Sequence, residues 1–297
     1  MQQTLTAHAV PASQSVPSQT TASPRTLTVD LPCGPMVVDI WEPRRAADVP
    51  PILLIHGWGG SGQYWAESAE ILSETARVIV PDLPGSGRSM PVAPAQDMYD
   101  QVDNLVALLD ALGLERVQLN GHSMGGAMTL LLADRVPEKI DRIVLTSTCF
   151  FLNEAQKRIY DGIMRLWFVV MRVRGPWMAN LPMLTRASAY RYFYRIPDDE
   201  ALLRAGFMDF ITMDFETARA CAHDAGDEAI TEAGSRVQAP TLLVACRQDT
   251  IMPTKNVGYT ASLIPRSEVR WIENCGHLPM VEKPTEYLSI LQDFLAL

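Results

Sequence analysis

Short apolar runs alternate with longer amphipathic segments along most of this chain. The short runs are rich in Val, Ile and Leu, as expected of buried strands, whereas the longer segments repeat apolar residues every three or four positions, as helices do. The predicted strands are residues 26–30, 35–41, 51–55, 77–81, 116–120, 142–146, 240–246 and 268–272. The predicted helices include 63–75, 99–114, 124–136 and 285–295. This alternation predicts an α/β fold in which helices flank a mostly parallel sheet, with the first two strands as an antiparallel pair at its edge.

The pattern changes between residues 149 and 235, where aromatic and arginine-rich helical segments replace the alternation. Such a block between two strands of one sheet predicts a helical cap inserted into the sheet domain. The first 25 residues are rich in Ser, Thr, Gln and Pro, and they cannot bury enough apolar area to offset the entropy of ordering. The predicted organisation is therefore a disordered tail at 1–25, core at 26–148, cap at 149–235 and core at 236–297.

Composition narrows the class of protein. With 297 residues, 47% of them hydrophobic, the chain is long enough for one large domain with an insertion. Its net charge of −9 predicts that the molecule as a whole repels phosphate backbones and anionic lipid surfaces, which argues against nucleic acid as a partner. Five scattered cysteines without a C-x-x-C pair indicate neither a disulfide framework nor a zinc site. Free thiols, no secretory signal and no run of ~18 apolar residues predict a soluble, cytoplasmic protein.

A G-x-S-x-G motif, GHSMG at residues 121–125, lies directly between the strand predicted at 116–120 and the helix predicted at 124–136. A strand that turns sharply into a helix holds its serine in a strained backbone conformation, and flanking glycines avoid collisions with neighbouring backbone. The free N–H groups at the start of the helix favour negative charge there. This placement predicts Ser123 as a nucleophile and leaves a chance serine in a glycine-rich helix start as the weaker interpretation.

A serine hydroxyl needs a base within hydrogen-bond reach, and five histidines are candidates. His277 follows the last predicted strand, so its side chain can lie at the carboxyl edge of the sheet, and we predict it as the base. His8 lies in the tail, His223 lies among acidic residues of the cap, and His56 starts a glycine-rich loop that its hydrogen bonds would fix. His122 is next to the nucleophile, and its side chain should point away from that of the serine.

The base needs a carboxylate that holds its imidazole in the useful tautomer. Asp249 follows the strand predicted at 240–246, so it would lie at the same sheet edge, and it comes between Ser123 and His277 in the order expected for such an enzyme. The alternative interpretation is an aspartate that only forms a turn. The other sheet-edge position open to an acid, directly after 142–146, holds no acidic residue.

Two backbone N–H groups are needed to bind the oxyanion of a tetrahedral intermediate. We predict that Met124, directly after the nucleophile, provides one, and that Trp58 in the HGWGG loop provides the other because Gly57 and Gly59 allow the backbone to approach closely. The Trp58 side chain has two equally supported interpretations, as a wall of the acyl pocket or as a loop aromatic packed on the cap. These residues imply no metal and no organic cofactor.

The blocks HGWGG, DLPGSGRS, GHSMGG, the strand that ends before Asp249, and CGHLPMVEKP together resemble those of the α/β-hydrolase superfamily, of the small capped esterase and lipase type. The resemblance covers residues 26–148 and 236–297 in the right order, and it implies both the fold and a triad of Ser123, Asp249 and His277. It also implies that DLPGSGRS is a structural turn. The serine of GHSMGG separates the chain from the similar epoxide hydrolases and haloalkane dehalogenases, which carry an aspartate there.

The resulting hypothesis is hydrolysis of a carboxylic ester of a small or medium apolar substrate through an acyl-enzyme on Ser123. The aromatic, Met-rich cap favours an apolar acyl or alkyl part in this small-molecule substrate. Three alternatives remain open: hydrolysis of a carbon–carbon bond in a meta-cleavage product, transfer of the acyl group to an alcohol, and binding without catalysis. Polar groups in the pocket would separate carbon–carbon bond cleavage from ester cleavage, and the sequence does not place those groups; nor does it predict an oligomeric state.

Charge is segregated within the predicted cap. Residues 157–195 hold eight Lys and Arg against a single acid, whereas residues 198–232 hold ten acids against two arginines. The favoured interpretation is that the two halves pack together and compensate each other's charge. The alternative is that the first half, whose apolar run at 166–171 lies between Arg165 and Arg172, faces an anionic lipid surface or an acidic substrate.

Overall fold

The computed structural model describes residues 23–45 and 48–297 of the chain. The strands are β1 (Arg25–Leu31), β2 (Gly34–Trp41), β3 (Ile52–Ile55), β4 (Val78–Pro81), β5 (Val117–His122), β6 (Ile140–Thr146), β7 (Thr241–Cys246) and β8 (Ser267–Ile272). They form one eight-stranded sheet in the order β1-β2-β4-β3-β5-β6-β7-β8. β1 and β2 pair antiparallel at one edge, β2 also pairs antiparallel with β4, and all pairs from β4 to β8 are parallel. The predicted α/β class with an antiparallel edge pair is confirmed.

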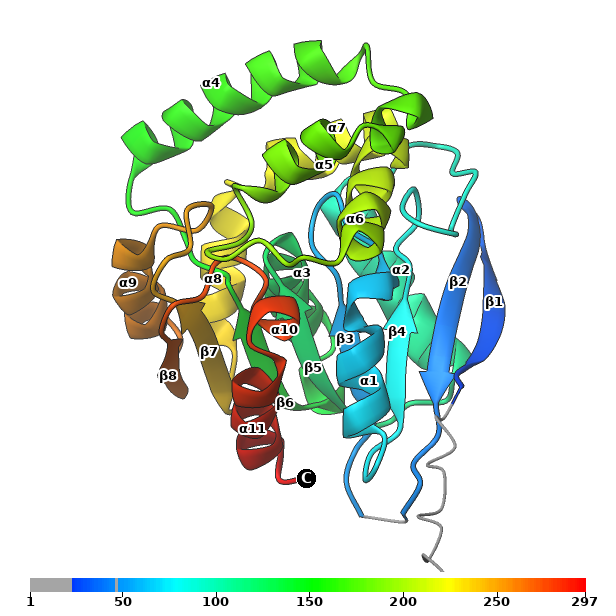
Figure 1. The fold of residues 1–297 in the computed structure, drawn as a ribbon. Coiled ribbons are helices and arrows are strands. Elements are labelled where there is room, and N and C mark those ends of the chain that lie inside the picture. Colours follow the sequence, from blue (N-terminus) through cyan, green and yellow to red (C-terminus); the bar gives the residue numbers. More distant parts are fainter. Residues whose placement is uncertain (1–22, 46–47) are drawn as a thin grey trace, which may run out of the picture.

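The helices connect these strands and cover the sheet (Figure 1). They are α1 (Ala66–Leu72), α2 (Met98–Ala111), α3 (Met124–Arg135), α4 (Glu154–Met171), α5 (Pro182–Ala189), α6 (Glu200–Thr212), α7 (Phe215–Asp224), α8 (Glu228–Arg236), α9 (Val257–Leu263), α10 (Pro279–Glu282) and α11 (Pro284–Leu295). The short 3-10 helices are η1 (Gly62–Trp65), η2 (Pro137–Lys139), η3 (Pro176–Asn180) and η4 (Thr254–Asn256). The predicted tail at 1–25 lies almost wholly outside the described residues, and β1 begins at Arg25.

Two apolar clusters fill the two faces of the sheet. Successive residues of β3 alternate between them: Leu53 and Ile55 pack with α2, α3 and α8, whereas Ile52 and Leu54 pack with α1 and α11. Burial on both faces explains why this strand is apolar at every position. Because β3 and β5 to β8 run parallel, their carboxyl ends meet at one edge, which fixes where the loops after them converge.

The helices α4 to α7, with η3, form a layer beyond the carboxyl edge of the sheet, and α4 is the outermost of them (Figure 1). Asp199 and Asp214 begin α6 and α7 by accepting hydrogen bonds from backbone N–H groups of the first turn. The helix α8, at the end of the segment predicted as cap, packs against α3 beside the sheet. The boundaries of 149–235 stay a prediction. None of the helices in the described residues is long and apolar enough to cross a lipid bilayer.

Candidate active site

Ser123 forms the turn between β5 and α3, with φ 54° and ψ −120°, a conformation that residues with a side chain rarely adopt. The glycines beside it leave no room for side chains: a Cβ on Gly121 would lie 2.2 Å from Gly125 O, and one on Gly125 would lie 2.6 Å from Ile55 O. The Ser123 N–H donates to Thr146 O at 2.9 Å, so β6 holds the turn in place. The strained turn expected from GHSMG is present, and its serine is only partly buried.

Asp249 and His277 meet at the carboxyl edge of the same sheet. Their side chains are buried, and His277 Nδ1 lies 2.8 Å from Asp249 Oδ2. The second carboxylate oxygen of Asp249 accepts the N–H groups of Ile251 and Met252 at 2.8 and 2.9 Å. With one oxygen held by backbone and the other facing the imidazole, the carboxylate fixes the ring so that Nε2 is the nitrogen left for chemistry.

A chain of hydrogen bonds joins the HGWGG loop to the loop of His277. The Gly57 N–H donates to Tyr64 Oη at 2.6 Å, and Tyr64 Oη lies 3.0 Å from His122 Nδ1. On the other side of the ring, His122 Nε2 lies 2.9 Å from the carbonyl oxygen of His277. Since that carbonyl can only accept, Nε2 carries the ring proton and Nδ1 accepts the tyrosine hydroxyl. Sequence reasoning missed Tyr64, which lies in η1 and within the helix predicted at 63–75, because a single tyrosine there has no distinguishing spacing.

His122 is a neutral, structural histidine. Burial, and after it the neighbouring His277, hold the pKa of His122 well below its ordinary value. The rings of His122 and His277 are 4.7 Å apart, so a charge on His122 would oppose a charge on His277. The uncharged ring therefore holds the His277 loop through a hydrogen bond to the carbonyl oxygen of His277.

The HGWGG loop lies directly against Ser123. A Cβ on Gly57 would be 3.0 Å from the Cβ of Ser123, which shows how closely the loop backbone approaches. The side chain of the next residue, Trp58, donates from Nε1 to Ala218 O on α7 at 2.8 Å and packs edge-on against Phe168. It therefore packs on the cap, as one of its two interpretations predicts. The other expected donor, Met124, begins α3 and has an N–H with no partner inside the helix.

One further histidine has structural surroundings. His56 Nε2 accepts the Leu83 N–H at 2.9 Å while Nδ1 faces Gly57 O, so the ring ties HGWGG to the DLPGSGRS turn, and burial lowers the pKa of His56. In that turn, Asp82 accepts N–H groups from both loops, as expected of a structural residue.

The last two histidines lie elsewhere. His223 is exposed beside an aspartate, and His8 lies outside the described residues.

Residues 190–195 of the cap make hydrogen bonds to the loop of His277 and the residues that follow it. The His277 N–H donates to Tyr192 O at 2.6 Å, and a Cβ on Gly276 would lie 2.5 Å from the same oxygen. Glu282 accepts three N–H groups, from Tyr194 and Arg195 of the cap and from Gly276 of the loop. The cap therefore fixes the backbone of the predicted base. Sequence reasoning missed this contact, because the two segments are far apart in the chain and carry no shared pattern.

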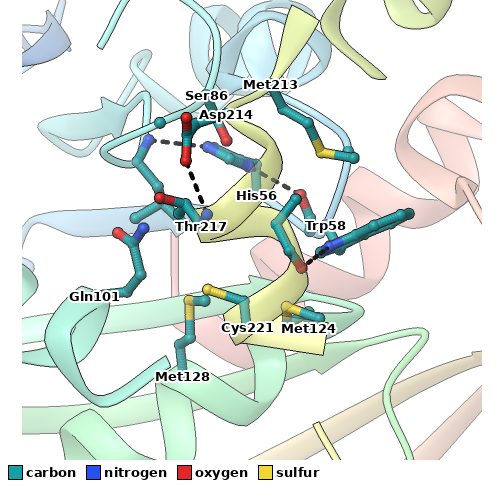
Figure 2. A pocket seen from close by; sticks show the side chains of 15 residues that line it. His56, Trp58, Ser86, Gln101, Met124, Met128, Met213, Asp214, Thr217 and Cys221 are labelled. Atoms are coloured by element: carbon teal, nitrogen blue, oxygen red, sulfur yellow. Dashed lines mark hydrogen bonds between the residues drawn. The ribbon is translucent and has the colours of Figure 1, made fainter. Parts of the chain in front are cut away.

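A cavity of about 30 Å³ lies beside the HGWGG loop and under α7 (Figure 2). Figure 2 shows sulfur-bearing side chains around it, with Trp58 at one side and Gln101 and Thr217 at the other. Its lining includes His56, Trp58, Leu83, Met124, Met128, Met213, Ala218 and Cys221. Its volume leaves room for about one or two water molecules or a short alkyl group. No set of three or more His, Cys, Asp or Glu within the described ranges is arranged to hold a metal ion.

Known proteins share this architecture. The sequence model of the family described as alpha/beta hydrolase fold matches residues 50–284. A protein of Pseudomonas syringae pv. syringae (strain B728a), provisionally named the carbamate hydrolase RutD, is 30% identical over 84% of this chain and 95% of its own length. The 2-hydroxymuconate semialdehyde hydrolase of Pseudomonas sp. (strain CF600) is 31% identical over 83% of this chain and 87% of its own.

Solved structures are similar as well. The crystal structure of a membrane phospholipase A, described as a bacterial virulence factor, superposes with a TM-score of 0.75 and 25% sequence identity. The superposed region covers 93% of this chain and 87% of the phospholipase chain. The similarity therefore extends over the sheet and the helical insertion together.

Proposed function

The chain is a hydrolase of the α/β-hydrolase fold family, and from this premise we propose that it cleaves a carboxylic ester of a small or medium apolar substrate with Ser123 as the nucleophile. One observation carries the proposal: a buried pair of Asp249 and His277, 2.8 Å apart, at the sheet edge where the strained turn presents Ser123. A strained backbone costs about 1–3 kcal/mol, and such strain is characteristic of sites where a reacting group must be presented.

In the proposed mechanism the Ser123 hydroxyl attacks the ester carbonyl while His277 Nε2 accepts its proton. The amides of Met124 and Trp58 stabilise the negative oxygen of the tetrahedral intermediate. His277 then protonates the departing alcohol and leaves an acyl group on Ser123. A water molecule attacks this acyl-enzyme, giving its proton to His277, and the acid departs as the proton returns to Ser123.

The cavity supports a short, uncharged acyl group. It adjoins both proposed oxyanion donors, Trp58 and Met124. Met128, Met213 and Cys221 make one part of its wall apolar and polarisable, whereas Gln101, Asp214 and Thr217 line another part. No lysine or arginine is among the residues that line it, so it offers no counter-charge to an anionic acyl chain. Turnover of p-nitrophenyl esters should accordingly fall from acetate and butyrate to decanoate, and Met128→Ala should shift the preference toward the longer chains.

A carbon–carbon or carbamate substrate is the second candidate, because relatives about 30% identical are named as a carbamate hydrolase and a 2-hydroxymuconate semialdehyde hydrolase. Both reactions use a carbonyl electrophile, so the same serine and histidine would serve them. We would measure kcat/KM for an aryl ester, an aryl carbamate and a meta-cleavage diketone in parallel, which ranks the three candidate reactions. A kcat/KM for the ester at least tenfold above the other two is the result we expect, and the reverse order would replace ester hydrolysis with the favoured reaction.

The test of the proposal is Ser123→Ala. We expect no measurable turnover of p-nitrophenyl butyrate above the rate in buffer, with an unchanged thermal unfolding curve, because only the hydroxyl is removed. Ser262→Ala, an exposed serine at the far end of α9, is the matched control and should keep full activity. Turnover retained by Ser123→Ala would refute the assignment of the nucleophile.

We also infer a cytoplasmic location from the cysteines. All five are free, and four of them are buried. The Sγ atoms of Cys246 and Cys275 lie 3.4 Å apart without a bond, next to Asp249 and His277 in the chain. A reducing compartment keeps such a close pair as thiols. Fractionation of the native host, with the chain in the cytosolic fraction, is the expected outcome.

A further inference from the structure

The outer face of α4, together with Val173 just beyond the end of the helix, presents an unbroken apolar stripe to solvent. Its members are between 53% and 76% exposed, and they follow one another at intervals of four, three, three and four residues, which keeps them on one side of a helix. They are Ile159, Ile163, Leu166, Val169 and Val173. Single exposed apolar residues are ordinary on a protein surface, but an aligned row of five large ones marks a contact surface.

The opposite face of α4 already accounts for the packing of this helix on the protein. Phe168 and Met171 are buried on that side, and Phe168 packs edge-on against both Trp58 and Phe215. The helix is therefore apolar on two sides, and only the inner one has a partner among the described residues. Exposed apolar side chains continue just beyond the helix, at Trp177 of η3.

A row of arginines runs beside the stripe. Arg158, Arg165 and Arg172 recur at every seventh residue and so lie on one side of the helix, next to the apolar row, and all three are exposed. Within residues 23–45 and 48–297, no carboxylate forms an ion pair with any of them. By contrast, Arg186 of α5 pairs with Glu200 of α6. Charge compensation inside the cap therefore explains Arg186 but not the row on α4.

We propose that the outer face of α4 docks the protein on the surface of a membrane that contains anionic phospholipids, with the helix lying in the plane of the interface. The apolar stripe would enter the boundary between headgroups and acyl chains while the arginine row contacts lipid phosphates. The remainder of this chain is acidic, at a net charge of −9 overall, so a negatively charged surface would repel the other faces and orient the protein with α4 toward the lipid.

The charges on α4 favour lipid over a second copy of the chain. A symmetric pairing of two such helices would need carboxylates beside the stripe to receive the partner's arginines. α4 contains two acids, Glu154 at its first residue and Asp161, which is partly buried, so the helix has no exposed carboxylate after its first residue. The α4 position, outermost in the cap and beyond α5 to α7, leaves the whole stripe accessible to a flat surface (Figure 1).

The test is co-sedimentation of full-length Ser123→Ala protein with vesicles, so that its result does not depend on catalysis. Vesicles of phosphatidylcholine and phosphatidylglycerol at about 3:1 are compared with pure phosphatidylcholine, at about 25 mM and about 500 mM salt. We expect binding to the anionic vesicles at low salt, at least tenfold weaker binding to the neutral ones, and loss of most binding at high salt.

Two variants of the surface locate the contact. Arg158→Gln/Arg165→Gln/Arg172→Gln should weaken anionic-vesicle binding by about fivefold per arginine, on the order of 100-fold in total. The matched control removes three exposed arginines outside α4, before β5, at the end of α3 and in β8, as Arg116→Gln/Arg135→Gln/Arg270→Gln, and should bind as the parent does.

The apolar stripe is tested in the same way. Ile163→Asn/Leu166→Asn should reduce binding about tenfold, whereas Ile71→Asn, an exposed apolar site on α1, should not change it. No binding to anionic vesicles at low salt would overturn the proposal, as would equal binding to neutral vesicles. A stable dimer in solution that Ile163→Asn/Leu166→Asn dissociates would reassign the face to a second copy of the chain.

Discussion

The loops at the carboxyl edge of the sheet and the outer face of α4 differ in whether their side chains have partners within the protein. Around His277 the ring, the backbone N–H and the carbonyl oxygen all have hydrogen-bond partners, supplied by Asp249, Tyr192 and His122. On α4 an apolar row and an arginine row have no partner among the described residues. The first region is specified by contacts within the chain, whereas the second requires something outside it.

This difference indicates where substitutions should matter for chemistry, where for folding and where for neither. A buried polar network costs most when one member is removed, because the remaining members are left unsatisfied. An exposed apolar row costs almost nothing to remove, because water already surrounds it.

Asp249→Asn should have the largest effect. The amide keeps the shape of the carboxylate, but its NH₂ group would face His277 Nδ1 and favour the wrong tautomer of the ring. We expect turnover of p-nitrophenyl butyrate to fall by about 10³–10⁴. Steady-state kinetics and thermal unfolding of the same sample separate a loss of activity from a loss of fold. A variant that keeps most of its activity would mean that another carboxylate orients the base.

Substitutions on the two faces of α4 should have very different effects on the free energy of unfolding. Phe168→Ala removes a ring packed between Trp58 and Phe215, and it should cost about 3–5 kcal/mol. Leu166→Ala, two residues away on the outer face, should change the free energy of unfolding by less than about 0.5 kcal/mol. Urea denaturation measures both. Equal costs would show that the outer face is packed against part of the same chain.

Asp209 of α6 joins the cap to the HGWGGSG loop, where it accepts a hydrogen bond from Ser61 Oγ at 2.6 Å. Burial raises the pKa of Asp209 to about 6, with a further increase from Asp82, although Ser61 and Arg88 oppose the rise. Since the folded state holds this proton more tightly than the unfolded state, this group's contribution to stability falls as pH rises from about 4 to about 6.

Asp209→Asn removes that titration and should make the protein more stable than the wild type at pH 8, by about 1–2 kcal/mol after allowing for partial exposure. Near pH 4 the two proteins should differ little, because the wild-type carboxyl is then protonated in both states. Urea denaturation across this pH range gives the difference directly. A variant that is less stable than the wild type at pH 8 would show that the ionised carboxylate holds the cap.

Tyr64→Phe should have the smallest effect on activity of the changes at the sheet edge. It leaves the Gly57 N–H and His122 Nδ1 without their shared partner but keeps the aromatic ring. We expect kcat to fall about tenfold, with KM nearly unchanged, because the HGWGG loop and the His277 loop lose a link that fixes their spacing. An unchanged kcat would mean that the loops hold their positions without it.

Much of the sheet edge could be predicted from sequence, because each piece has a local signal. A strand, a glycine-flanked serine and a helix follow one another at GHSMG, and Asp249 and His277 each come after an apolar run. Parallel strands place their carboxyl ends at one edge, so the three residues could be brought together without coordinates. The structure confirms the strands and the proximity of Asp249 to His277.

The contacts between cap and core could not be predicted in the same way. His277 meets Tyr192, and Ser61 meets Asp209, although these pairs are far apart in the chain and consist of common residue types. The same holds for α4, where the sequence contains two apolar faces. Which of them packs inward depends on where Trp58 and Phe215 lie, and only the tertiary structure fixes that.

The most direct test of the central claim is mass spectrometry of the protein after reaction with a fluorophosphonate. The reagent bonds to a serine only where a base activates the hydroxyl and an oxyanion site stabilises the adduct. We predict one adduct per chain, mapped to the peptide that contains Ser123, and much slower labelling of Asp249→Asn. An adduct on any other residue, or equal labelling of Ser123→Ala, would contradict it.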